Sequence, residues 1–160
     1  VACNPLDAES VRAAFDVANL EGAVLTSANH KGQAEADKLF IDAAVAAGCP
    51  YLVKLGTIQS YTSMDSHVEY GRFHADIEAH LASHCGSMAW TVLHPNWFFT
   101  NHLGDIFGTV PKGIVVYPVD PAAKACMIDP RDVGDVAAAL LLDQENVAKY
   151  DKKSFDLSGP

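Results

Sequence analysis

The hydrophobic pattern of this chain changes its period several times along the sequence. Short apolar runs, such as GAVLTSA at 22–28 and YLVKLG at 51–56, are typical of strands buried in a parallel sheet. Between them, QAEADKLFIDAAVAAG at 33–48 has apolar residues at helical spacing and ends at a glycine suited to a helix C-terminus. Strands that alternate with helices of this length predict an α/β protein with a parallel sheet.

The remaining segments continue this alternation. We expect further helices at about 68–83 and 129–144, and right-handed crossovers would place helices on both faces of the sheet. Further strands are expected over MAWTVLHP at 88–95, GIVVYPV at 113–119 and FDLSGP at 155–160. The sequence shows no internal repeat and no low-complexity linker, so we expect a single domain over residues 1–160.

Composition and net charge argue against several classes of protein and partner. Apolar residues make up 49% and charged residues 19%, as in a globular protein, and the net charge of −9 argues against nucleic acids and anionic membranes as partners. No apolar run approaches the roughly 20 residues of a membrane-spanning helix, and VACNPLDAES at the start does not resemble a signal peptide. The four cysteines form no CxxC motif, so we expect buried thiols in a cytoplasmic protein.

Five segments, taken in order, resemble the NmrA-like branch of the short-chain dehydrogenase/reductase superfamily. They are NPLDAESVRAAF, IDAAVAAGCPYLVKLGT, HADIEAHLASHCGSMAWTVLHPNWFFTN, MIDPRDVGDVAAALLL and FDLSGP. The resemblance covers nearly the whole chain. It implies a Rossmann-type sheet that holds NAD(P), often NADPH, in a family that contains reductases as well as nucleotide sensors with little turnover.

One part of the family pattern is absent from this sequence. The family begins with a strand and a G-x-x-G-x-x-G loop, whereas the glycines here are isolated and VAC would be only the tail of the third family strand. In the strand order 3-2-1-4-5-6, loss of the first two strands leaves GAVLTSA as a bare apolar edge, which tends to recruit another chain.

Three explanations stay open for this absence: an incomplete chain or gene model, a partner that supplies the missing half, or a naturally shortened domain. For the chain as given, we expect a homodimer or another partner that covers the exposed edge. We also expect weakened NADP(H) binding, because the main anion cradle is missing.

The candidate catalytic residues follow from the same resemblance. The superfamily uses a serine after one strand and then a Tyr-x-x-x-Lys helix, and Thr57, Tyr70 and His74 stand at similar spacing with Thr for Ser and His for Lys. Residues four apart share a helix face, so a protonated His74 could lower the pKa of Tyr70, which would then give a proton to a substrate carbonyl held by Thr57. Alternatively, Tyr70 and His74 simply pack or line the pocket.

The cofactor-binding candidates lie at the ends of three expected strands, at the carboxyl edge where ligands bind in such sheets. The resemblance also implies that the HPNWFFTN turn walls the nicotinamide and substrate pocket. A half-buried structural role at the sheet rim is the alternative for the lysine. The candidates are Thr26, Ser27, Ala28, Lys54, His94, Pro95, Asn96 and Phe98.

Two other motifs favour structural roles over catalytic or metal-binding ones. His80 and His84 are spaced so that they could share a metal ion, but no third ligand is evident, and we expect a solvated helix face. In DPRD, Asp129 and Arg131 are expected to cap a helix and pair locally.

The leading functional hypothesis is therefore an NmrA-like reductase that moves hydride from NADPH to a small carbonyl, quinone or imine. One alternative is a cofactor-independent lyase, isomerase or cyclase that uses Tyr70 or His74 as acid or base. Another is a non-enzymatic nucleotide-sensing or regulatory module. The residues do not identify a substrate.

Overall fold

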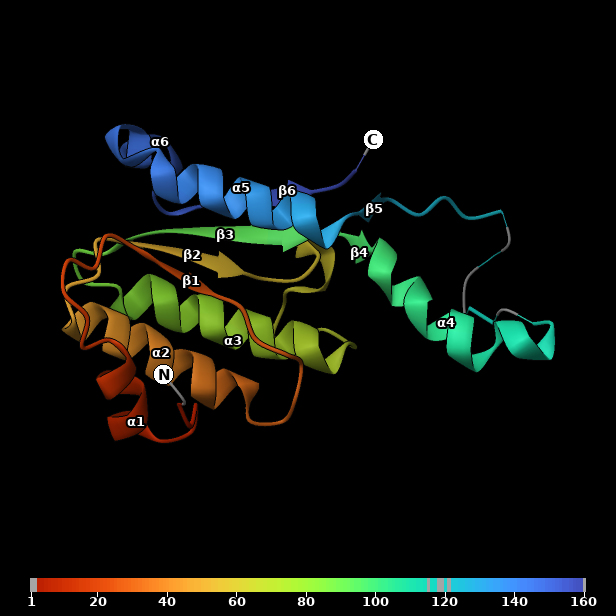
Figure 1. Ribbon diagram of the computed structural model, residues 1–160, viewed down its shortest axis with the longest axis horizontal. Coiled ribbons are helices and arrows are strands. Elements are labelled where there is room, and N and C mark those ends of the chain that lie inside the picture. Colours follow the sequence, from red (N-terminus) through yellow and green to blue (C-terminus); the bar gives the residue numbers. More distant parts are fainter. Residues whose placement is uncertain (1–2, 115, 118–119, 121, 160) are drawn as a thin grey trace.

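The computed structural model describes residues 3–114, 116–117, 120 and 122–159. Its main sheet has four parallel strands in the order β1-β2-β3-β6 (Figure 1). These strands are β1 (Ala23–Leu25), β2 (Tyr51–Leu55), β3 (Ala89–Pro95) and β6 (Lys153–Leu157). The expected parallel α/β architecture is confirmed, with β1 shorter than the run that predicted it.

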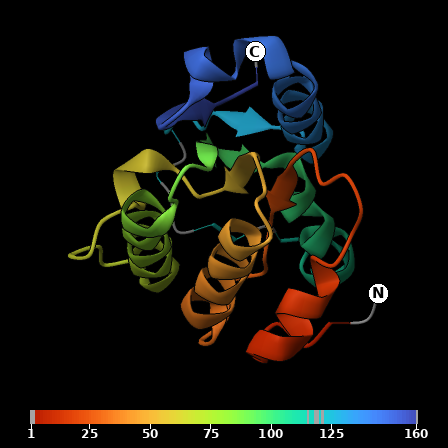
Figure 2. The same ribbon diagram turned by 90° about the vertical axis from the view of Figure 1, so that its left-hand side faces the viewer.

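Helices cover both faces of this sheet, as expected. The helices α2 (Gln33–Ala46) and α3 (Glu69–His84) lie on one face with α1 (Ala8–Ala14) beside α2, and α5 (Pro130–Leu142) lies on the other (Figures 1 and 2). A short helix, α6 (Val147–Tyr150), leads from α5 into β6. Short 3₁₀ turns occur at Gln59–Tyr61, Phe99–His102, Val110–Lys112 and Gln144–Asn146.

Successive side chains of β2 point to opposite faces of the sheet and contribute to two apolar cores. Leu52 packs with Ile77 and Leu81 on the α3 side, whereas Tyr51 and Val53 pack toward α5. All five side chains are at most 1% exposed, and each fully buried aliphatic side chain contributes roughly 1.5–3 kcal/mol of folding free energy. The buried Tyr51 hydroxyl is satisfied by Thr91 Oγ1 at 2.7 Å. This double burial explains why the sequence of β2 is apolar along most of its length.

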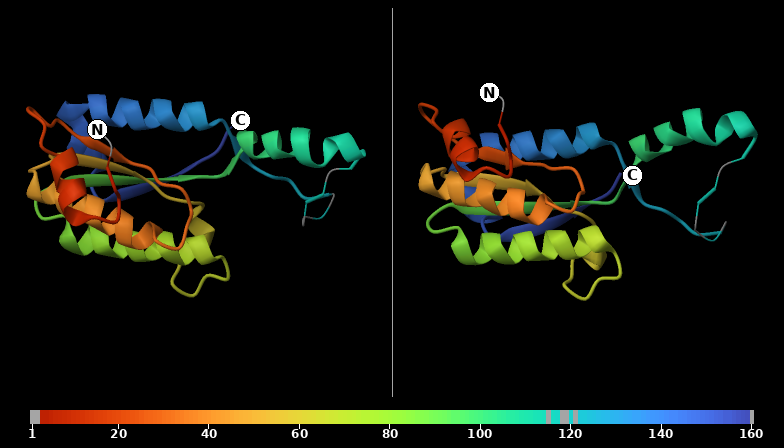
Figure 3. Two further views of the ribbon diagram at one scale, coloured as in Figure 1. Left: turned by 60° about the horizontal axis from the view of Figure 1, so that its bottom comes forward. Right: turned by 90° about the horizontal axis from the view of Figure 1, so that it is seen from below.

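The chain between β3 and α5 departs from the sheet layers. There β4 (Trp97–Phe98) and β5 (Met127–Ile128) form a separate two-stranded parallel sheet, and α4 (Leu103–Gly108) projects away from the main sheet (Figures 1 and 3). The expected strand at 113–119 is not found: residues 113, 114, 116 and 117 are not in a strand, and residues 115, 118 and 119 lie outside the described part.

Several smaller expectations are also resolved. Asp129 caps α5 by accepting a hydrogen bond from the Arg131 backbone, and the Arg131 guanidinium pairs with the same carboxylate. Cys49 and Cys85 are buried, but Cys3 and Cys126 are exposed, so the expectation of buried thiols was wrong for two of the four. Across the described residues, none of the helices combines the length and the apolar character needed to cross a bilayer.

Candidate functional site

The ends of β1, β2 and β3 meet at one edge of the sheet and enclose a pocket of about 660 Å³, which we call the carboxyl-edge pocket. Because all three strands are parallel, the loops that follow them converge there. Helix α3 closes one side. The lining residues are Ser27, Asn29, Leu55, Gly56, Thr57, Ile58, Tyr61, Tyr70, His74, Pro95, Asn96, Trp97, Phe98 and Asn101.

The three candidate catalytic residues, Thr57, Tyr70 and His74, all line this pocket. Four of the cofactor-binding candidates also do so: Ser27, Pro95, Asn96 and Phe98. Residues from three separate loops and one helix are thus brought together. Their roles in binding or catalysis remain predictions, since position alone assigns no chemistry.

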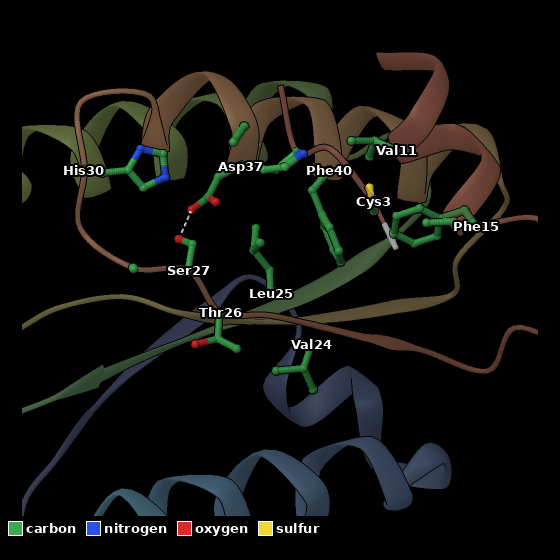
Figure 4. A pocket seen from close by; sticks show the side chains of 14 residues that line it. Cys3, Val11, Phe15, Val24, Leu25, Thr26, Ser27, His30, Asp37 and Phe40 are labelled. Carbon is green, nitrogen blue, oxygen red and sulfur yellow. Dashed lines mark hydrogen bonds between the residues drawn. The ribbon is translucent and has the colours of Figure 1, made fainter. Parts of the chain in front are cut away.

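Thr26 and Ala28 lie elsewhere, in a second cavity of about 420 Å³ along the outer edge of β1. Figure 4 shows this edge cleft between α1, β1 and α2, with the side chain of Thr26 turned away from that of Ser27. Ser27 borders both cavities.

Lys54 and His94 line neither cavity. Lys54 is 0% exposed and His94 is 1% exposed, so both side chains are buried in the layer between the sheet and α3. The expectation of a half-buried Lys54 at the sheet rim was therefore wrong. With four further residues, which lie on α2 and α3, they form what we call the buried polar cluster: Gln33, Asp37, Lys54, His74, Glu78 and His94.

The contacts within this cluster are specific. Lys54 Nζ lies 3.0 Å from His74 Nδ1 and 3.7 Å from Glu78 Oε1, and it donates to the Leu55 carbonyl at 3.2 Å. His94 Nδ1 donates to the Thr57 carbonyl, and its Nε2 lies 3.6 Å from Glu78 Oε2. The cluster therefore connects β2, β3 and α3 directly behind the loop that carries Thr57.

A second branch reaches toward β1. The Gln33 amide nitrogen lies 3.4 Å from His74 Nε2 and 3.2 Å from Ser27 Oγ, and the Ser27 hydroxyl donates to Asp37 Oδ2 at 2.9 Å. The buried groups thus extend from His74 to the wall shared by the two cavities.

Burial sets the protonation of His74. It lowers the pKa of the imidazole to about 3, with further lowering by the positive charges of Lys54 and His94. His74 is therefore neutral near pH 7. The mechanism that required a protonated His74 to lower the Tyr70 pKa is wrong for this ring, because the ring is buried and lies beside the positive charge of Lys54.

Burial raises the pKa values of the carboxyl groups in the cluster, whereas it lowers the pKa of His74. It raises the pKa of Asp37, although the Ser27 hydrogen bond and the Lys54 charge oppose the rise. It also raises the pKa of Glu78, again opposed by Lys54 and by His94. Burial lowers the pKa of Lys54, and Glu78 and Asp37 counteract this. Such opposed shifts beneath one pocket are typical of functional sites, and they also occur in structural ion networks.

Two glycines allow the backbone and side chains around the pocket to pack closely. A Cβ at Gly71 would lie 2.2 Å from the Tyr61 carbonyl oxygen, so only glycine lets the 3₁₀ turn rest on α3 next to Tyr70. A Cβ at Gly56 would lie 3.1 Å from Glu78 Oε1 and from His94 Nδ1. The missing side chains make room for the pocket wall and for the buried cluster beneath it.

The sequence interpretation named neither Gln33 nor Asp37 as a site residue. A signal was nevertheless available: Gln33 and Asp37 precede Ile41 on the buried stripe of α2 at four-residue spacing. Polar residues on an otherwise apolar helix face need partners inside the fold. Only the packing of α2 against α3 shows which partners these are.

The described residues fit one end of a nicotinamide dinucleotide. A volume of about 660 Å³ is typical of small-molecule sites, and Ser27, Thr57 and Asn96 supply polar groups beside the apolar rings of Trp97 and Phe98. This suits a nicotinamide riboside. For the pyrophosphate, none of the described loops has the closely spaced glycines of a dinucleotide cradle, since the glycines of this sequence are isolated.

The histidines on the surface of α3 form a different arrangement. The His80 and His84 rings stack with centroids 4.1 Å apart, and His80 Nε2 lies 2.7 Å from Asp42 Oδ1. Within the described ranges, no group of three or more His, Cys, Asp or Glu side chains is placed to hold a metal ion.

Comparison with solved structures adds the fold relationship. The NADPH-dependent quinone oxidoreductase of Escherichia coli, complexed with NADPH, matches with a TM-score of 0.75 and 21% identity over 98% of this chain and 52% of its own. The triphenylmethane reductase of a Citrobacter species, complexed with NADP(H), matches with a TM-score of 0.74 and 15% identity over 98% and 52%. A nucleoside-diphosphate-sugar epimerase of Staphylococcus aureus reaches a TM-score of 0.79 at 12% identity over 99% and 54%.

The fold is Rossmann-like. At identities this low the likeness establishes architecture alone, and the chain spans about half the length of these proteins. No family model matches the chain, and neither does any curated protein. The Rossmann-like assignment agrees with the carboxyl-edge position of the pocket, which is where ligands bind in such sheets.

Proposed function

We propose that this chain forms the substrate and nicotinamide side of an NAD(P)-linked reductase that acts on a small carbonyl or quinone. The carboxyl-edge pocket carries this proposal, because it gathers Ser27, Thr57, Tyr70 and Asn96 at the ligand edge of a Rossmann-like sheet. The solved structures with this fold include reductases complexed with NADP(H).

Each residue has a stated part in the proposed reaction. Reduced nicotinamide, when bound, supplies the hydride. Thr57 holds the substrate oxygen, and the Tyr70 hydroxyl donates a proton to that oxygen as negative charge develops on it. The phenolate of Tyr70 then regains a proton from water, so that one hydride and one proton enter the substrate. Neutral His74 serves as a hydrogen-bonding group for a ribose or substrate oxygen rather than as an acid.

The apolar wall has a separate part. Trp97 and Phe98 bring aromatic side chains into the pocket beside Tyr61 and Tyr70. Planar rings pack well against such surfaces, which favours a quinone over an aliphatic carbonyl as the first substrate class to test.

The proposal is tested by following NADPH oxidation in the presence of 1,4-naphthoquinone as the probe substrate. We expect the wild-type chain to consume NADPH with saturable dependence on the quinone. Tyr70→Phe should lower kcat about 100-fold, because general acid catalysis contributes about 10²–10⁴ in rate, and should leave KM for the quinone nearly unchanged.

Tyr150→Phe is the matched control. The Tyr150 hydroxyl donates to Asp143 at 3.0 Å on the opposite side of the sheet and does not line the carboxyl-edge pocket. This variant should keep wild-type turnover. Equal loss in both variants, or no quinone-dependent NADPH oxidation by the wild type, would contradict the proposed reaction.

A further inference from the structure

Lys54 places its amino group inside the core. Its side chain lies on the α3 side of β2, flanked in register by Leu25 and Val92, and is 0% exposed. Burying a charge costs several kcal/mol unless specific partners compensate. The ordinary occupant of such a position is an aliphatic residue, as at Leu52 two residues earlier. A lysine here therefore needs a physical explanation.

Its partners define its geometry. Lys54 Nζ lies 3.0 Å from His74 Nδ1, a normal hydrogen-bond distance, and 3.7 Å from the Glu78 carboxylate. An ammonium group can only donate hydrogen bonds. The ring nitrogen that faces it must consequently present its lone pair.

We propose that Lys54 is a positioning residue of the carboxyl-edge pocket, which donates to His74 Nδ1 and so holds the imidazole as the tautomer that carries its proton on Nε2. The Nε2–H is then the polar group that His74 offers to a ligand. Its nearest side-chain neighbour is the Gln33 amide, whose nitrogen lies at 3.4 Å and whose oxygen has no hydrogen-bond partner among the described residues. With the proton on Nε2, the amide turns by 180° so that its oxygen accepts from Nε2–H, and a ligand oxygen that enters the pocket replaces that acceptor.

The environment of this pair comes from several elements. Asp37 on α2, Glu78 on α3 and His94 on β3 surround Lys54 and His74. The two carboxyl groups favour the charged form of Lys54, against the effect of burial. Gly56 contributes by leaving room for Glu78 Oε1, which a Cβ would approach to 3.1 Å.

Lys54 acts through His74 and not on the ligand. It lines neither cavity, whereas His74 lines the carboxyl-edge pocket. The identity of the acceptor, a ribose hydroxyl or a carbonyl oxygen, rests on the proposed function. The tautomer does not, because it is a property of the ligand-free protein.

The test is nuclear magnetic resonance of protein labelled with ¹⁵N-histidine, in which long-range ¹H–¹⁵N correlations report the tautomer of each ring. The wild-type protein should show neutral His74 with its proton on Nε2 from pH 5 to pH 8. In Lys54→Met, which keeps the length of the side chain but removes the donor and the charge, both tautomers should appear, and His74 should begin to titrate at higher pH.

Lys38→Met is the matched control. The Lys38 side chain forms a surface ion pair with Asp76 at 2.7 Å and, among the described residues, makes no hydrogen bond or ion pair with the side chains of the buried polar cluster, so its loss should leave the His74 signals unchanged. Binding of reduced nicotinamide mononucleotide should weaken about tenfold in Lys54→Met, the equivalent of about 1.4 kcal/mol, and should not change in Lys38→Met.

Two results would overturn the inference. One is a wild-type His74 that carries its proton on Nδ1, which needs no variant to detect. The other is a folded Lys54→Met protein with the wild-type tautomer and titration. If the mononucleotide does not bind the wild type while the Nε2–H tautomer is present, the proposed function fails and the role of Lys54 stands.

Discussion

His74 loses its proton when the chain folds. Its pKa falls to about 3 in the folded protein from about 6.5 in an unfolded chain. The folded state then binds fewer protons than the unfolded state between these two values. The contribution of His74 to stability is therefore complete above pH 6.5 and is lost as the pH falls toward 3, by up to about 1.4 kcal/mol per pH unit.

This predicts a pH-dependent difference between the wild type and His74→Gln. The free energy of unfolding of the wild type should fall relative to that of the variant as the pH is lowered from 7 to 5, because glutamine has no proton to gain. Urea titrations at the two pH values measure the difference. Asp37 and Glu78, whose pKa values are raised, act with the opposite sign in both proteins, so the comparison largely removes them. A difference that is independent of pH would contradict the burial of a neutral ring.

At the residue scale, position was easier to predict than environment. The strand-end rule brought Thr57, Ser27 and Asn96 to one edge, and helical spacing placed Tyr70 near His74. The sequence does not show that His74 is buried or that Lys54 is its hydrogen-bond partner. Those facts depend on how α2, α3 and β2 pack, which involves residues 20 or more positions apart.

The start of α3 depends on a close approach that only glycine permits. Gly71→Ala would place a methyl group 2.2 Å from the Tyr61 carbonyl oxygen, so the 3₁₀ turn at Gln59–Tyr61 must shift away from the pocket. We expect a loss of about 1–3 kcal/mol in the free energy of unfolding, typical of overpacking. Urea unfolding measures it.

Gly134→Ala provides the matched control within α5. A Cβ there meets nothing within 4 Å, so alanine should stabilise the helix by about 0.5–1 kcal/mol through its higher helix propensity. If both substitutions were stabilising, the turn would not rest on α3 as described.

At the element scale, the sequence predicted α2, α3 and α5 to within two residues at each end, because their apolar stripes are long and face a core. It was wrong about residues 113, 114, 116 and 117, where an apolar run faces no sheet. It also missed β4 and β5, whose two-residue strands are too short to show a period.

At the scale of the whole molecule, the main sheet ends at β1 on one side and at β6 on the other, and neither edge is paired further within the described residues. Within the described part of the chain, β1 hydrogen-bonds only to β2, and Ala23–Leu25 carries no charge to discourage pairing. Next to it lies the edge cleft, lined by apolar side chains such as Val11 and Phe40 (Figure 4). We propose that a second copy of the chain covers this edge.

Light scattering during gel filtration measures the association. The wild type should elute as a dimer, and Val24→Lys should elute as a monomer, because a lysine on an edge strand opposes strand pairing. Val24 is 42% exposed, and Val110, which is 51% exposed and remote from β1, gives the control Val110→Lys. A monomeric wild type, or a dimer that only Val110→Lys disrupts, would contradict this arrangement.

The central claim is that the carboxyl-edge pocket of this Rossmann-like chain binds the nicotinamide end of the cofactor. The most direct measurement is a titration with reduced nicotinamide mononucleotide, followed by the backbone ¹H–¹⁵N signals of the protein. We expect saturable shifts at Ser27, Thr57, Tyr70 and Asn96. Shifts confined to the edge cleft around Val11 and Phe40, or none at millimolar ligand, would contradict the claim.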